Sequence, residues 1–171
     1  MSLTFRVLET TTARLWEFGW LDVSRFAVDG STTDRTSGEA VVRAFIADPI
    51  SGRSFLGWKN PWGADEHHHG PFVRSSLRAE WYRPVAREAL GPQVAKFLEA
   101  QEWNEPPSAG ELHPIQEWID ALATDVEVFM LQAPPPPAAR WECWYIWRFF
   151  AEFVSVSPER SEMTIAVVGE D

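Results

Sequence analysis

Apolar and polar side chains alternate along the first third of the chain. Residues 3–9 alternate, and residues 24–28 continue the pattern up to the turn dipeptide Asp29-Gly30. Residues 14–21 are likewise predicted to form a strand, with three rings on one face: Trp16, Phe18 and Trp20. Alternation over this length is typical of half-buried strands.

The pattern of residues 40–59 predicts a hairpin. A polar stretch rich in turn-forming residues, 30–39, precedes it. The two strands would span 40–47 and 54–59, and the loop between them contains turn-favouring Pro and Gly. This hairpin would complete the N-terminal block of strands.

The middle third has helical periodicity. Residues 74–90 carry apolar side chains at i+4 steps, with Gly91 as the predicted stop and Pro84 as a predicted kink or break. A second helix is predicted to begin at Pro92, an acceptable first helical position. The clearest helix is residues 114–123, opened by Pro114, whose apolar positions are Ile115, Trp118, Ile119 and Leu122.

The last third returns to strand patterns. Residues 125–131 alternate, and residues 163–169 would form the second strand of a C-terminal hairpin. The proline-rich stretch 132–139 is predicted to be a rigid loop. Residues 141–157 predict one long central strand. Its odd positions are apolar and would face the core: Trp141, Cys143, Tyr145, Trp147, Phe149, Ala151 and Phe153. Its even positions would meet water in part through Glu142, Arg148 and Glu152.

The order strands, helices, strands predicts an α+β fold. At 171 residues the chain fits a single domain, 1–171. We expect a mostly antiparallel twisted sheet made of the N-terminal strands and a C-terminal hairpin. A central block of about three helices would pack on one of its faces.

The composition of the chain indicates the cellular compartment in which the protein works. The single cysteine, Cys143, excludes an internal disulfide and is expected to be a buried, inert side chain. The N-terminal residues have no apolar core typical of a secretory signal, and no stretch has the length of a membrane span. Thirteen of the fifteen basic residues are Arg, which is compatible with a GC-rich genome. We therefore expect a bacterial cytoplasmic protein that does not bind membranes.

Negative charge is concentrated in one segment. Of the formal net charge of −10, residues 97–139 contribute eight acids and no Lys or Arg. Such a field favours a basic protein partner and disfavours nucleic acid. The acids predicted to contact the partner are Glu99, Glu102, Glu105, Glu111, Glu117 and Asp120. The alternative is a surface that serves solubility only.

These observations predict a non-catalytic protein-binding domain of the inhibitor, immunity or assembly-component type. Trp103, within the acidic segment, would serve as an aromatic anchor, as would Trp62 in a neighbouring loop. The four arginines Arg74, Arg78, Arg83 and Arg87 are expected to pair locally with Glu80 and Glu88, and not to bind nucleic acid. The sequence leaves the oligomeric state open.

A second hypothesis rests on the loop from Trp58 to Phe72. An H-x-H pair could supply two metal ligands, with Glu66 as a base on a bound water. The candidate ligand-binding residues are Trp58, Trp62, Asp65, His67 and His69. The function would then be small-molecule binding or metal-assisted hydrolysis. Because the only histidine outside residues 67–69, His113, lies in a different segment, we expect no bound metal and no cofactor.

Overall fold

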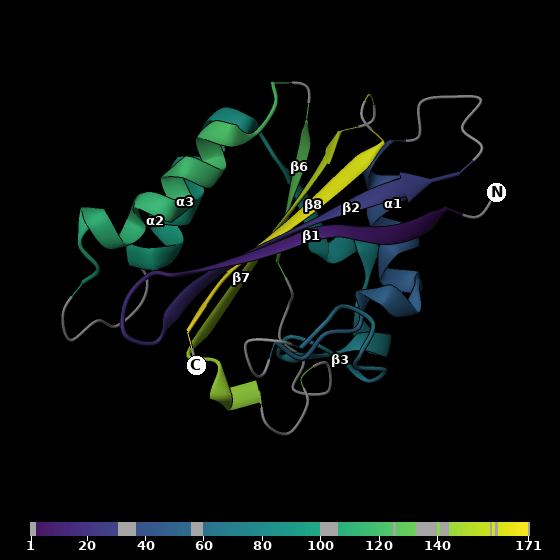
Figure 1. The fold of residues 1–171 in the computed structure, drawn as a ribbon, viewed down its shortest axis with the longest axis horizontal. Helices are drawn as coiled ribbons and strands as arrows, with labels where there is room; N and C mark the ends of the chain where they lie inside the picture. The colour runs from purple at the N-terminus through teal and green to yellow at the C-terminus, as the bar shows by residue number, and fades with distance from the viewer. Residues whose placement is uncertain are drawn as a thin grey trace.

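The computed structural model describes most of the chain: residues 3–30, 37–55, 60–99, 106–124, 126–132, 140, 144–157, 159 and 161–170. A six-stranded sheet runs in the order β1-β2-β8-β7-β6-β5, with every neighbouring pair antiparallel. Its strands are β1 Thr4–Arg14, β2 Gly19–Asp29, β8 Glu162–Glu170, β7 Phe149–Ser157, β6 Glu127–Leu131 and β5 Tyr82–Val85. The α+β class and the antiparallel sheet are confirmed (Figure 1).

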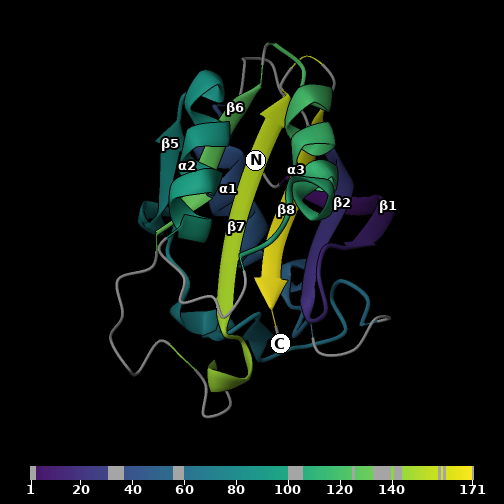
Figure 2. The ribbon, with the colours of Figure 1, turned by 90° about the vertical axis from the view of Figure 1, so that its left-hand side faces the viewer.

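The three helices of the described chain lie on both faces of the sheet, not on one as expected. They are α1 Gly38–Ala47, α2 Leu90–Glu99 and α3 Ala109–Ala121. In Figure 2, α2 and α3 lie in front of the sheet and α1 lies behind it. Two separate apolar clusters result, one against α1 and one against α2 and α3.

The central strand β8 is apolar because both of its faces are covered. Met163, Ile165, Ala166 and Val167 are all completely buried. Ile165 and Val167 contribute to the cluster under α1, and Ala166 contributes to the cluster under α2 and α3. Burial of both faces explains why this strand reads as an apolar run instead of an alternating one.

Residues 40–47 form α1, not the first strand of a hairpin. The Ser37 hydroxyl accepts a hydrogen bond from Ala40 N and caps the helix start. The helix ends at Ala47, and its C-cap Asp48 is extended because the ring of Pro49 restricts the preceding residue. Side chains with high strand propensity, Val41 and Val42, are held in a helix because one face of that helix is buried on the sheet.

The predicted helix over residues 74–90 is also wrong. The segment consists of 3-10 turns at Arg74–Ser76, Ala79–Trp81 and Arg87–Ala89 and the edge strand β5. Pro84 is tolerated in β5 because an edge strand has one unpaired side. Gly91 lies inside α2 and does not end a helix.

The helix predicted from Pro114 begins earlier than expected. Its N-cap is Ser108, whose hydroxyl accepts from Glu111 N while the Glu111 carboxylate accepts from Ser108 N. This capping box fixes the start of α3, so Pro114 lies inside the helix.

The long strand predicted over 141–157 is shorter. Residues 141–143 lie outside the described chain, Trp144–Ile146 is a 3-10 turn, and β7 begins at Phe149. Tyr145 is 69% exposed, so its assignment to the core is wrong, whereas Trp147, Phe149 and Phe153 are buried. Glu152, expected to meet water, is buried.

The first hairpin turns earlier than the alternation suggests. Residues 15–18 connect β1 to β2, and Phe18 is 57% exposed. The rings of residues 14–21 therefore do not share one strand face. No helix in the described part of the chain combines the length and apolarity that a membrane crossing demands.

Candidate functional site

Helices α2 and α3 carry the described acids that were predicted to contact a partner. Their buried side chains pack against the sheet: Leu90, Val94, Leu98, Ile115 and Trp118. This arrangement turns the polar sides of both helices toward solvent. The predicted amphipathic pattern of α3 is confirmed for Ile115 and Trp118.

The predicted partner-binding acids divide into two groups. Glu99, Glu117 and Asp120 are exposed, and Glu111 is half-buried at the start of α3. Glu102, Trp103 and Glu105 lie outside the described residues.

The described acids of α3 have local partners only. Glu117 Oε1 lies 3.3 Å from His113 Nε2, and Asp120 Oδ1 accepts a 2.8 Å bond from Gln116 Nε2. Hydrogen bonds from the Ser108 hydroxyl and backbone lower the pKa of the Glu111 carboxyl. Within the described chain, neither Lys nor Arg forms an ion pair with these three acids.

The histidine loop lies on the other face of the sheet, with the α1 cluster. Trp62 belongs to that cluster, and its indole Nε1 donates a 2.8 Å hydrogen bond to Ser24 Oγ. A ring expected at the lip of a site is instead part of the core, because its polar edge finds a buried acceptor. Trp58 lies outside the described residues.

Asp65 organises the loop. Its carboxylate accepts bonds of 2.9 Å from the backbone N–H groups of His67 and His68 and lies 3.0 Å from His68 Nδ1. Burial raises the pKa of Asp65, but these hydrogen bonds outweigh burial and hold the pKa below the ordinary 3.8. The Asp65 carboxylate therefore forms its hydrogen bonds within the loop.

His69 is completely buried and joins the loop to β7. Its Nδ1 lies 2.6 Å from the Ser51 carbonyl, and its Nε2 lies 2.5 Å from Glu152 Oε2. The Tyr82 hydroxyl donates a 2.9 Å bond to the other oxygen of Glu152. Because a carbonyl only accepts, Nδ1 carries a proton, so one further proton is shared between Nε2 and Glu152.

Opposing effects act on the His69 ring. Burial lowers its pKa, whereas the charge of Glu152 and the hydrogen bonds to Glu152 and Ser51 raise it; the net pKa lies above 6.5. For Tyr82, burial first, and then the charge and hydrogen bond of Glu152, raise the pKa well above 10.0. The geometry and the raised pKa of His69 favour an imidazolium–carboxylate pair.

A second buried pair, missed in the sequence, lies beside the first. Arg53 donates from both terminal nitrogens to the two oxygens of Asp22, over 2.8 and 2.9 Å, and both side chains are nearly solvent-free. The guanidinium also lies 4.5 Å from the centre of the Phe55 ring and 5.1 Å from that of Trp62. The Ser24 and Thr12 hydroxyls donate to the same carboxylate.

These contacts show that the polar side chains of the loop region hold the fold together inside the protein. His67 is exposed and His69 is buried, so the H-x-H pair does not converge on one point. The described residues contain no group of three or more His, Cys, Asp or Glu placed to hold a metal. A catalytic role would also need access for a substrate, which complete burial of His69 and Glu152 denies.

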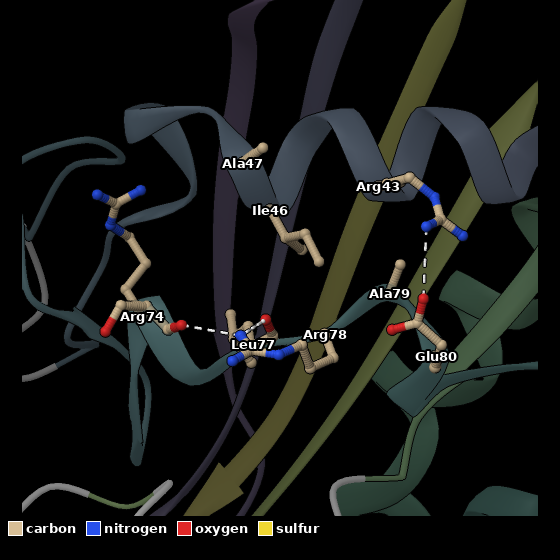
Figure 3. A pocket seen from close by; sticks show the side chains of 9 residues that line it. Arg43, Ile46, Ala47, Arg74, Leu77, Arg78, Ala79 and Glu80 are labelled. Atoms are coloured by element: carbon tan, nitrogen blue, oxygen red, sulfur yellow. Dashed lines mark hydrogen bonds and ion pairs between the residues drawn. The ribbon is translucent and has the colours of Figure 1, made fainter.

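A shallow groove of about 440 Å³ runs between α1 and residues 74–80 (Figure 3). Ile46 and Leu77 form part of its apolar lining, and Arg43 pairs with Glu80 at one end over 3.4 Å. Arg74 and Arg78 donate to backbone carbonyls, not to the acids expected from the sequence. The guanidinium groups of Arg43 and Arg74 lie far apart along the groove, so they do not form one anion site.

Comparison with known proteins gives no relative: the chain matches no protein-family model, no curated protein and no solved structure. The solvent sides of α2 and α3 carry the exposed acids Glu99, Glu117 and Asp120.

Proposed function

We propose that the chain is a non-catalytic protein-binding domain, of the inhibitor, immunity or assembly-component type, whose acidic helical face docks on a basic partner protein. The observation that carries this proposal is the outward placement of two α3 carboxylates that have no Lys or Arg partner among the described residues. Glu117 and Asp120 are exposed, and neither pairs with Lys or Arg in the described chain. Such a field attracts a cationic surface over a Debye length.

The position of these acids adds a second argument. Asp120 lies in the last turn of α3, and that turn contains no basic residue. The helix dipole disfavours an anion at a C-terminal end by about 0.3–1 kcal/mol. Asp120 accepts a hydrogen bond from Gln116 within the helix, but its charge opposes the dipole, and a contact with a cationic surface outside the chain would offset that cost.

The loop hypothesis of a small-molecule binder or metal-assisted hydrolase has weaker support. Its two best ligands, His67 and His69, point into different environments. Its residues Asp65 and Trp62 already have partners inside the protein.

The test is charge reversal on α3. The wild-type chain is used to recover a binding protein from its native cell, and the association rate with the purified partner is measured at several salt concentrations. Glu117→Lys with Asp120→Lys should slow association about tenfold and flatten its salt dependence. The fold should persist, because both side chains are exposed.

A matched control reverses two exposed acids elsewhere. Asp29→Lys with Glu66→Lys changes the net charge equally but leaves α2 and α3 intact. Equal slowing by both double variants would mean that only the total charge matters. An unchanged rate with the α3 variant would reduce the acidic face to a solubility surface.

A further inference from the structure

Strand β1 is an unusually open edge. It runs for 11 residues, and its side chains are exposed or half-buried along the whole length. In the described chain it pairs with β2 alone, and it forms the outermost strand of the sheet (Figure 2). Val7 and Leu8, near its middle, are among the exposed large apolar side chains. A long open edge of this kind is a template for pairing with another strand.

The opposite edge is built differently. Strand β5 has only four residues and contains Pro84, which cannot donate a hydrogen bond to a new neighbour. Short length and proline are two of the features that protect an edge; charged side chains and bulges are others. Strand β1 lacks the first two and has Arg6, Glu9 and a bulge instead, so the two edges of the sheet are not equivalent.

A row of alternating charge ends at the open edge. Arg25 on β2 lies 3.2 Å from Glu162 on β8 and 3.4 Å from Glu9 on β1. One guanidinium therefore serves two carboxylates, which leaves the row with a surplus negative charge. Its outer member, Glu9, lies on β1, which has no further neighbour among the described strands, so a cation beyond β1 would continue the alternation.

Arg6 supplies the matching cation. A bulge at Leu8 shifts the register, so that Arg6 lies opposite Ala27 and Glu9 lies opposite Arg25. Ala27 and Arg25 are two apart on β2, so Arg6 and Glu9 share one face, with Val7 at the position between them. Within the described residues Arg6 has no ion-pair partner.

We propose that β1 pairs antiparallel with β1 of a second copy, with Val7 opposite Val7 on a two-fold axis. This register places Arg6 of each copy opposite Glu9 of the other on the same sheet face. Two rows of charge would then run through the dimer in the order Glu162, Arg25, Glu9 and the second copy's Arg6. The bulge is essential, because without the extra residue Arg6 and Glu9 would lie on opposite faces.

The contact is small. A strand-to-strand interface falls well below the roughly 1,600 Å² of a standard stable complex. We therefore expect a concentration-dependent dimer with a dissociation constant in the micromolar to millimolar range.

Sedimentation equilibrium over a wide protein concentration tests the proposal. Arg6→Glu and Glu9→Arg should each raise the dissociation constant about tenfold or more, because each variant places like charges opposite each other at both symmetry-related pairs. The two single variants mixed together should form a heterodimer, since both pairs are then opposite in charge. The double swap Arg6→Glu with Glu9→Arg should likewise recover dimerisation.

Arg83→Glu on the opposite edge is the control, because it makes the same charge reversal at an exposed position on β5. It should leave the dissociation constant unchanged. A chain that stays monomeric at all concentrations would overturn the proposal. So would an Arg6→Glu variant that dimerises like the wild type, or single variants that fail to associate when mixed.

Discussion

His69 Nε2 lies 2.5 Å from Glu152 Oε2, and both side chains are fully shielded from solvent. The first belongs to the short hairpin formed by β3 His68–His69 and β4 Phe72–Val73, and the second to β7. The contact therefore ties the loop region to the middle of the sheet by a polar bond inside an apolar cluster. Removing one partner of such a buried pair strongly destabilises the fold, because the other partner stays buried without compensation.

Glu152→Ala should destabilise the fold by about 3–5 kcal/mol, because it leaves a buried imidazole and the Tyr82 hydroxyl without their acceptor. Urea unfolding measures the loss. Glu152→Gln, which keeps an acceptor, should cost clearly less. Glu117→Gln removes an exposed carboxylate that also faces a histidine, and should change stability by less than about 0.5 kcal/mol.

Stability should decrease as the pH rises above neutrality. The pKa of His69 is raised above 6.5 in the folded protein, so the contribution of its protonated form is fully present below about pH 6.5. That contribution is lost as the pH increases through the raised folded value. Urea unfolding across this range should show a falling free energy of unfolding, and His69→Gln should remove most of the slope. A wild-type slope equal to that of the variant would contradict the imidazolium–carboxylate pair.

Arg53→Lys should lower the Tm by about 4–8 °C. A lysine cannot donate to both Asp22 oxygens in the planar fork or stack on the Phe55 ring, and a loss of about 2 kcal/mol gives this shift in a domain of this size. Arg25→Lys is the comparison, since its ion pairs are half exposed. Its Tm should change little. Thermal unfolding of both variants tests whether the burial of Arg53 causes the larger change in Tm.

Trp147 and Tyr145 form a contrasting pair. Trp147 is 4% exposed and Tyr145 is 69% exposed. Trp147→Ala should cost about 3–5 kcal/mol by opening a cavity. Tyr145→Ala should cost less than about 0.5 kcal/mol. Denaturant unfolding that gave the two variants similar losses would show that the start of β7 is packed differently.

The sequence predicts the elements whose pattern is local. Alternation identifies β1 and β6, and helical spacing identifies α3. It fails at α1, where Val41 and Val42 fit a strand equally well and burial on the sheet decides the outcome. It fails again at β5, where apolar side chains at helical spacing come from turns that pack on the core.

The buried polar pairs could not be predicted from the sequence. Asp22 and Arg53 are 31 positions apart, and His69 and Glu152 are 83 apart. Each residue alone reads as a surface side chain, because charged groups are rarely buried without a partner. Only the folded sheet brings the partners together. The acids of α3 could be placed because helical periodicity is a short-range property.

The proline in β5 limits how large an assembly this sheet could build. A subunit with two open edges adds neighbours without end and grows into a fibre, whereas a subunit with one open edge stops at two. Because Pro84 closes one side, pairing through β1 uses up the available edge in a single step. Within the proposed pairing, replacing that proline would remove one of the two features of β5, proline and short length, that keep the contact from propagating.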